Sequence, residues 1–476
     1  MVRQCHAKLL PALSTKNTHS LTRPFEFSIL ALLTLPAVKP CNSRSLVTEP
    51  VDFMPHNTRI TFPGRTYFAA ILLILASVFA VTGAVAGDKQ YYDIQYKARL
   101  DPESGLADVE ITLAGEQLPS KLTLHLDPSR HQNLEGEFLT RESDEAVWTP
   151  KGERASIRYQ FVIDAKKSSG RYDSRIIDKW AILRSDKMIP PISARAPKQL
   201  QSRATLAVEV PRKWNVLAPY TKDDDGIFQL RDPGRRFIRP KGWMIAGRIG
   251  SRQDVIDGTE TVVAAPLGKN IRRQDTLAFL SWTLPELKKV FPQFPNKLLI
   301  VMARDPMWRG GLSGTRSLFM HADRPLISGN RTSSLLHELV HVATGIRGDH
   351  ESDWIVEGIA EYYSLQTLRR TKGISEKRFK GALKDLAAWG RESPNLLVKR
   401  SSGPITARAV GVLHEVDLEI QQSSGGKRSL DDVVKALAKE RGRVTVRKFR
   451  TLAEEAAGKP LAQLNRENLS GENLRK

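Results

Sequence analysis

The chain has 476 residues, of which 41% are hydrophobic and 26% are charged, and its 73 Lys and Arg against 52 Asp and Glu give a net charge of +21. This balance supports a folded core and excludes a fully disordered chain, a collagen-like repeat and a protein with many membrane spans. The length predicts two or three domains. Because only two cysteines occur, Cys5 and Cys41, a disulfide scaffold and a cysteine-ligated zinc site are also excluded.

Near the N-terminus, residues 67–82 (YFAAILLILASVFAVT) form an apolar run without a charge. Arg59 and Arg65 precede this run, and Ala84-Val85-Ala86 follows it. The order of basic, apolar and small residues is typical of a secretory signal with cleavage after Ala86. We therefore expect an exported protein, either periplasmic or extracellular.

Two alternatives stay open for residues 1–86, which we interpret as an N-terminal extension with a signal peptide. The segment 67–86 could remain uncleaved and anchor the protein to the membrane. Met54 could also be the true start, since a signal peptide rarely begins so far upstream of its hydrophobic core.

The positive charge extends beyond this segment. Residues 1–86 carry 8 basic and 3 acidic side chains, which leaves 65 basic and 49 acidic side chains, a net charge of +16, on the rest. The Lys and Arg residues are scattered and no RNA-binding signature occurs, so no nucleic-acid partner is predicted. Solubility explains the excess charge, although anionic surfaces or acidic peptides would also be favoured.

Residues 87–262 are predicted to form a β-rich domain. Short runs of alternating polar and apolar residues recur, with Gly, Pro, Asp and Ser between them, which is typical of an antiparallel sandwich. The stretch 168–240 is rich in Arg, Pro and Gly and is expected to carry long loops. The expected strands are 91–100, 107–113, 121–126, 156–162 and 204–210.

Residues 263–460 change to a helical period, and the fold class is therefore α+β. One buried strand is expected at 297–303 (KLLIVMA), and the polar tail 461–476 is expected to fray. The expected helices are 276–291, 332–344, 354–370, 376–388, 408–422, 430–440 and 446–456.

The strongest chemical signal is His337-Glu338-Leu339-Val340-His341 in one of these helices. Residues four apart lie on one helix face, so both imidazoles can reach one metal ion. Glu338 is placed to take a proton from a metal-activated water, and Gly345 is expected to end the helix. The five-residue pattern alone also arises by chance, so the surrounding sequence has to support it.

The following helix supplies that support. Glu357 lies 16 residues after His341 and can be the third ligand, so that two nitrogens and one carboxylate leave a zinc position open. Glu361 is one turn further on the same face, where it can accept the outer N–H of a ligand histidine and fix its tautomer. Ser352 or Asp353 can cap this helix.

HELVH followed by VEGIAEYY resembles the gluzincin metallopeptidases and is most similar to their glycyl aminopeptidase family. The resemblance covers about residues 265–440. It implies a thermolysin-like, mainly helical catalytic domain with one Zn²⁺ per chain, held by His337, His341 and Glu357.

A second match is Gly310-Gly311-Leu312, which resembles the strand that pairs with the substrate backbone in that family. The match implies that an edge strand near 312–318 aligns an extended peptide. Here the family's Glu-His after Gly-Gly-Leu is Ser313-Gly314, so a carboxylate that would hold a substrate α-amino group is missing.

The family's oxyanion-binding tyrosine is also missing. Thr406 stands at its position, and no tyrosine follows Tyr363. Since an oxyanion donor contributes about 10²-fold in rate, a replacement is expected, with His414, Arg408 or Tyr362 as candidates.

Other interpretations are weaker. A metzincin site would need Gly at Thr344 and His at Arg347, so that class is excluded. His350 is expected in a solvated loop, and His321 on the surface, with a place near the cleft as the alternative. Tyr362 and Tyr363 are expected to pack in the core. The sequence thus predicts an exported zinc peptidase acting on peptide or protein substrates, with a metal-binding or partner-binding protein that has lost turnover as the alternative.

Overall fold

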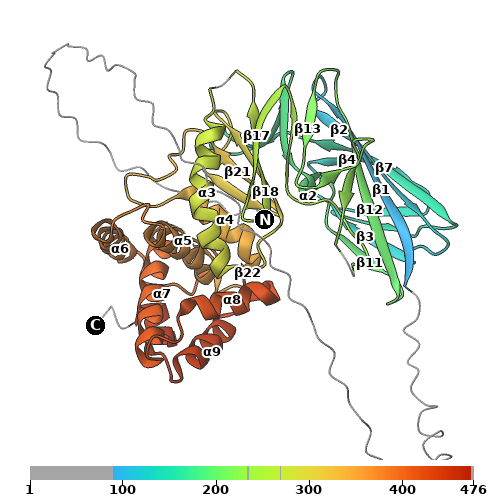
Figure 1. The fold of residues 1–476 in the computed structure, drawn as a ribbon. Coiled ribbons are helices and arrows are strands. Elements are labelled where there is room, and N and C mark those ends of the chain that lie inside the picture. The colour runs from blue at the N-terminus through green and yellow to red at the C-terminus, as the bar shows by residue number, and fades with distance from the viewer. Residues whose placement is uncertain (1–88, 233–234, 269, 402, 473–476) are drawn as a thin grey trace, which may run out of the picture. The chain divides into compact units, whose positions relative to one another are not determined.

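The computed structural model describes residues 89–472 apart from 233–234, 269 and 402, so the expected signal or anchor at 67–86 lies outside the described residues. In the described part, strands and then helices follow each other along the chain, as Figure 1 shows. No helix among the described residues is long and apolar enough to cross a membrane.

The N-terminal sheets form from strands in which apolar residues alternate with polar ones. In β1 the side chains of Tyr92, Ile94, Tyr96, Ala98 and Leu100 are all buried, and the residues between them face outward. β1 lies inside a seven-stranded sheet. Its order is β14 (Thr221–Lys222), β15 (Phe228–Leu230), β12 (Leu200–Glu209), β1 (Gln90–Asp101), β2 (Leu106–Ala114), β7 (Arg154–Val162) and β4 (His131–Gly136).

Two further sheets complete this β-rich part. The first consists of β11 (Ile192–Arg195), β3 (Lys121–His125), β6 (Glu145–Trp148) and β5 (Leu139–Glu142). The second consists of β13 (Asn215–Leu217), β16 (Trp243–Gly247), β10 (Trp180–Arg184), β9 (Tyr172–Ile177) and β8 (Ala165–Lys166). A short helix, α2 (Ser185–Met188), follows β10.

All five expected strands are confirmed, but one expectation for this part is wrong. The sandwich is not purely antiparallel, because β1 and β12 pair in parallel, with Gln90 opposite Leu200. Alternation in sequence shows which face of a strand is buried and leaves its direction open. The expected long loops are present in part: the region 168–240 contains the strands β9 to β15, and no strand occurs among the described residues from 231 to 242.

A separate five-stranded mixed sheet supports the helical part. Its order is β17 (Ile249–Ile256), β18 (Thr259–Pro266), β19 (Lys297–Ala303), β21 (Ser317–His321) and β20 (Gly311–Gly314). β19 is the expected buried strand and pairs in parallel with both β18 and β21. The expected edge strand at 312–318 is in fact the hairpin that joins β20 and β21, with β20 at the edge. The expected domain boundary between 262 and 263 falls inside β18.

The helices pack around one large apolar core that includes Leu284, Leu336, Ile359 and Leu413. All seven expected helices are present. They are α3 (Arg273–Val290), α4 (Ser334–Thr344), α5 (Asp353–Arg370), α6 (Glu376–Gly390), α7 (Gly403–Ser423), α8 (Leu430–Glu440) and α9 (Val446–Ala457).

The described part of the tail, residues 461–472, does not fray as expected. Leu461, Leu464 and Leu469 are buried, in or beside η1 (Ala462–Leu464) and α10 (Arg466–Ser470). The segment is polar on average, and this average gave no sign of the three leucines. They pack in the helical core and attach the segment to it.

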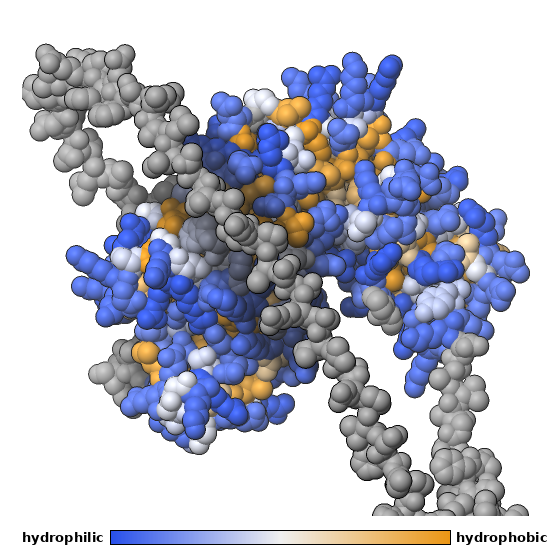
Figure 2. All heavy atoms as spheres, viewed as in Figure 1, coloured by the Kyte–Doolittle hydropathy of each residue, from blue (hydrophilic) through white to orange (hydrophobic). Residues whose placement is uncertain are grey.

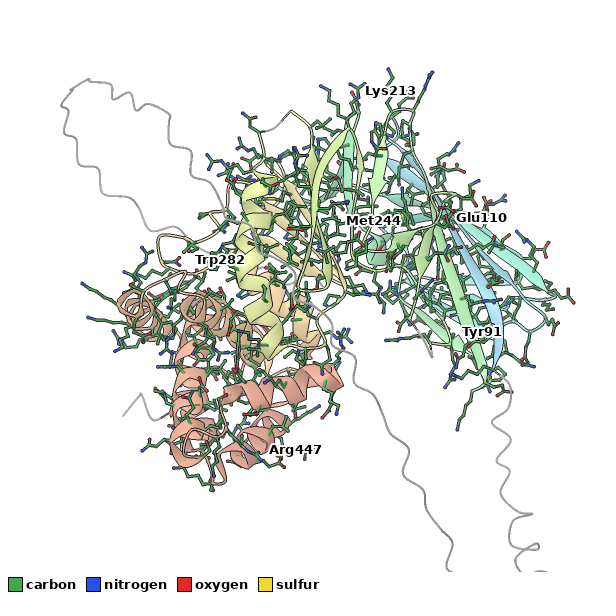
Figure 3. All side chains as sticks on the ribbon, in the orientation of Figure 1. Tyr91, Glu110, Lys213, Met244, Trp282 and Arg447 are labelled. Atoms are coloured by element: carbon green, nitrogen blue, oxygen red, sulfur yellow. The ribbon has the colours of Figure 1, made fainter. Side chains whose placement is uncertain are left out.

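The surface is hydrophilic over most of the face shown in Figure 2, with hydrophobic residues in separate patches. Figure 3 shows the same division at single residues, since Met244 is buried in the interior while Lys213 and Arg447 extend outward. A surface of this kind is ordinary for a folded protein in water.

Candidate metal centre

The helix α4 carries the HELVH residues and has well-defined ends. Ser333 is its N-cap, with a side-chain oxygen that accepts from the N–H of Leu336 at 3.3 Å. Gly345 ends the helix in the left-handed conformation at φ 58°, as expected, and its N–H donates to the carbonyl of His341. The helix end therefore follows one turn after the second histidine.

α5 is held against α4 by a reciprocal contact between two buried serines. The hydroxyl of Ser364 donates to the carbonyl of Ser333 at 3.0 Å and accepts from the N–H of Ser333 at 3.3 Å. This contact fixes the register between the helix that carries the histidines and the helix that carries Glu357.

The loop between the two helices is held as well. It contains β22 (Ile346–Gly348), which pairs with β23 (Gly442–Val444) in a two-stranded parallel sheet. Ser352, the residue before α5, does not cap the helix with its side chain. Its hydroxyl instead lies within hydrogen-bond distance of two acceptors, Oδ1 of Asp349 and the carbonyl of Val444.

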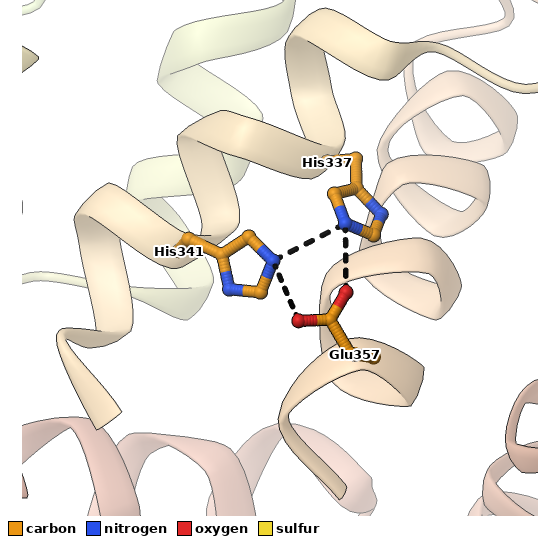
Figure 4. Close-up of side chains that lie close together, drawn as sticks. All are labelled: His337, His341 and Glu357. Atoms are coloured by element: carbon orange, nitrogen blue, oxygen red, sulfur yellow. Dashed lines mark hydrogen bonds and ion pairs between the residues drawn. The ribbon is translucent and has the colours of Figure 1, made fainter. Parts of the chain in front are cut away.

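The structure brings His337, His341 and Glu357 together, as Figure 4 shows. The Nε2 atoms of the two histidines are 3.2 Å apart. The carboxylate of Glu357 lies 3.4 Å from Nε2 of His337 through Oε2, and 3.6 Å from Nε2 of His341 through Oε1.

These distances fit a tetrahedral metal site. Ligand atoms at the usual zinc distance of about 2.0–2.1 Å are roughly 3.4 Å apart along the edge of a tetrahedron. The residues present thus match zinc both in donor type and in spacing.

The electrostatics of the group agree with this arrangement. Glu357 is fully buried, and burial alone would raise its pKa, but His341 and His337 outweigh burial and hold the pKa of Glu357 well below its usual value. The carboxylate is therefore ionised, as a metal ligand has to be.

Glu361 lies where the sequence predicted. A carboxylate can only accept, so the Nδ1–H of His337 donates to Oε2 of Glu361 at 2.9 Å. This contact places the lone pair of His337 on Nε2, which faces His341 and Glu357.

Glu338 lies against the edge strand β20. A Cβ atom built on Gly311 would stand 2.4 Å from Cγ and 2.8 Å from Oε1 of Glu338, so a larger residue at this position would displace the side chain of Glu338. Gly310 neighbours it and accepts from the N–H of His321, while Leu312 is buried. The expected substrate strand and the expected general base are thus in direct contact.

The three candidate oxyanion donors contact other groups. The hydroxyl of Tyr362 donates to Asp417 at 2.7 Å, and Tyr363 donates to Asp431 at 2.8 Å, which confirms both tyrosines as packing residues. Arg408 donates to the backbone carbonyls of Asn468 and Leu469. The ring of His414 lies against those of Tyr362 and Phe379.

The two remaining histidines of the sequence analysis have different outcomes. His350 is exposed in a loop, as expected. His321 was expected on the surface, but only 1% of it is exposed, since it is the last residue of the buried strand β21 and lies beside Asp305.

Sequence reasoning missed two residues whose side chains bind backbone carbonyls of β20. The indole N–H of Trp243 donates to the carbonyl of Leu312 at 2.8 Å, and Arg184 donates to the carbonyl of Ser313 at 3.3 Å. Both residues come from the β-rich part of the chain, where no motif marks them.

Solved structures share this fold. A protein of the aminopeptidase N family from Idiomarina loihiensis aligns with a TM-score of 0.56 at 14% identity, over 79% of this chain and 72% of its own. An M1 zinc metallopeptidase from Deinococcus radiodurans aligns over 81% of this chain and 93% of its own, with a TM-score of 0.50 at 15% identity.

A mutant of the Deinococcus enzyme with a substrate of sequence Tyr-Ser-Ala bound gives a TM-score of 0.52 at 17% identity, over 81% of this chain and 94% of its own. No family model matches the sequence, and no curated protein matches it either. The described part of the chain therefore has the fold of the M1 metallopeptidases, with a cluster of two histidines and one glutamate that suits zinc.

Proposed function

We propose that this protein is a zinc-dependent peptidase in which His337, His341 and Glu357 hold one Zn²⁺ per chain and Glu338 is the general base. The observation that carries the proposal is that Glu338 lies both next to His337 in the chain and against Gly311 of an edge strand. A metal site, a base and a strand for an extended peptide thus adjoin each other.

Bound zinc would supply a Lewis acid that polarises the scissile carbonyl and makes water more acidic. Glu338 would accept a proton from the attacking water on a carboxylate oxygen and then pass it to the leaving amine. Glu361 would keep His337 in one tautomer throughout. The outer edge of β20 would align the substrate through backbone hydrogen bonds, since a free strand edge presents unpaired N–H and C=O groups.

Finer aspects of the assignment rest on sequence resemblance. The Gly-Gly-Leu segment favours the glycyl aminopeptidase branch of the gluzincins, and the order of a β-rich part followed by helices favours a thermolysin-like catalytic domain. The apolar segment 67–82 favours export, with cleavage after Ala86 or retention as a membrane anchor, and N-terminal sequencing of the exported protein distinguishes the two.

The test combines metal analysis with peptide digestion. Plasma mass spectrometry of the purified protein is expected to give one zinc per chain, and a peptide library analysed by mass spectrometry is expected to show cleavage. Glu338→Gln should keep the zinc and lose cleavage, while Glu455→Gln, at an exposed position of α9, should keep both. Full activity of Glu338→Gln would refute the proposal.

A second candidate is a zinc-binding or partner-binding protein without turnover. It is favoured by the contacts of Tyr362, Arg408 and His414, each of which is engaged by groups other than the metal ligands. A zinc-loaded wild type that cleaves no more of the library than Glu338→Gln would support this second candidate.

A further inference from the structure

Along β20, the backbone N–H and C=O groups of one residue pair with β21, and those of the next residue face the outer edge of the sheet. The N–H of His321 donates to the carbonyl of Gly310, and the antiparallel register then makes Leu312 and Phe319 the next hydrogen-bonded pair. The N–H and C=O groups of Gly311 and Ser313 therefore point away from β21, toward the edge where a substrate strand would lie.

Along this edge, the carbonyl of Ser313 is already engaged. Nη1 of Arg184 donates to it at 3.3 Å. The other side of the same guanidinium binds Asp186, with Nε to Oδ1 at 3.1 Å and Nη2 to Oδ2 at 2.6 Å. Asp186 also accepts from the N–H of Gly242 at 3.0 Å, so both of its oxygens are occupied.

Further cations surround this pair. Arg239 donates to the backbone carbonyls of Asp186 and Ile189. Burial, with the charges of Arg235 and Arg239, lowers the pKa of Lys241, and the carboxylates of Asp232 and Asp186 only partly oppose this. Two carboxylates, those of Asp186 and Asp232, face four cations here, so this end of β20 carries a positive field. The cations are Arg184, Arg235, Arg239 and Lys241.

The positive charge at this end of β20 affects which group of a substrate can lie there. If a substrate pairs antiparallel to β20 with its scissile bond at Gly311, the residues on its N-terminal side run along Ser313. An α-ammonium group is positive and can only donate, and at this place it would meet a guanidinium that can also only donate. A peptide or acyl carbonyl, in contrast, would accept from Arg184.

We propose that the site takes peptide segments without a free α-ammonium group at this position, that is, internal segments of a chain or N-acylated peptides, and that Arg184 sets this preference. The inference rests on the proposed peptidase function and names its substrate class. It makes the enzyme an endopeptidase or a peptidase of blocked N-termini rather than an aminopeptidase.

A gain-of-function variant follows from the alternation of β20. The missing Cβ of Gly311 points at Glu338, and Leu312 packs on the opposite face with Trp243, so the side chain of Ser313 lies on the same face as Glu338. Ser313→Glu would add a carboxylate on the catalytic side of the strand while leaving the Arg184–Asp186 pair intact.

The experiment uses two fluorescent peptides of one sequence, one N-acetylated and one with a free α-amine, and the zinc-loaded protein. Cleavage is measured with the wild type, and binding is measured with Glu338→Gln. The acetylated peptide is expected to be favoured by about tenfold or more in both measurements. Ser313→Glu should shift the ratio toward the free amine, and Arg184→Met should abolish the preference.

Because Arg184→Met leaves Asp186 without its partner, its thermal unfolding is measured too, and Ser313→Glu carries the test independently. Arg158→Met, which breaks the exposed pair with Glu110, is the matched control and should keep the wild-type ratio. Equal or tighter binding of the free-amine peptide would overturn the inference. Tighter binding of the acetylated peptide, with cleavage of neither peptide by the wild type, would instead refute the peptidase proposal and leave the binding preference standing.

Discussion

Gly311 and Glu338 are in such close contact that a methyl group on Gly311 would overlap the side chain of Glu338. The contact joins the edge strand β20 to the helix α4 through the side chain of Glu338. It therefore sets the distance between the expected general base and the strand that would hold a substrate.

Gly311→Ala should lower kcat/KM by about 10²-fold, because the added methyl displaces the carboxylate of Glu338. Zinc content should stay at the wild-type value, since the three metal ligands are untouched. Gly411→Ala is the matched control, because a Cβ at Gly411 meets nothing within 4 Å. Unchanged activity of Gly311→Ala would show that Glu338 does not need this position.

Glu361→Ala should weaken zinc binding by about 10- to 100-fold, because His337 loses the acceptor that fixes its tautomer. Glu361→Gln keeps an acceptor oxygen and should have a smaller effect. Competition with a chromogenic chelator measures both affinities, and Glu455→Ala is the control at an exposed position. Equal zinc affinity of Glu361→Ala and the wild type would exclude a positioning role.

The metal-site residues could be predicted because their geometry is local. His337 and His341 share a helix face by their spacing alone, and Glu357 follows after a short loop, so one helix pair determines the site. The Gly-Gly-Leu segment was found by resemblance, and the register of β20 then explains why its second residue is a glycine.

Other features could not be predicted because they depend on partners far away in the sequence. Arg184 and Ser313 are 129 positions apart, and no local pattern connects them. The parallel pairing of β1 with β12 has the same origin, since alternation shows the buried face and leaves the neighbouring strand open. His321 was misjudged because a single histidine shows no period that would indicate burial.

Ser364→Ala should lower the free energy of unfolding by about 1–3 kcal/mol, because the N–H of buried Ser333 loses its acceptor, while the C=O of Ser333 keeps the N–H of His337. Ser281→Ala, at an exposed position of α3, is the control and should change stability by less than about 0.5 kcal/mol. Urea unfolding of the zinc-free proteins gives both values, and equal midpoints would show that the serine contact does not hold the helices together.

Tyr362→Phe distinguishes a packing residue from an oxyanion donor. The hydroxyl of Tyr362 donates to buried Asp417 at 2.7 Å and accepts from Gln366 at 2.6 Å, and burial raises its pKa well above the usual value. Its removal leaves Asp417 with one donor fewer, so the free energy of unfolding should fall by about 1–3 kcal/mol.

The kinetics of the same variant should be nearly unchanged, with kcat/KM within about twofold of the wild type, because the hydroxyl is engaged inside the helical core. An oxyanion donor would instead lose about 10²-fold in kcat at unchanged stability. The two roles thus predict opposite patterns. A large loss of kcat with wild-type unfolding would mean that Tyr362 leaves Asp417 during the reaction and takes the place of the tyrosine that Thr406 replaces.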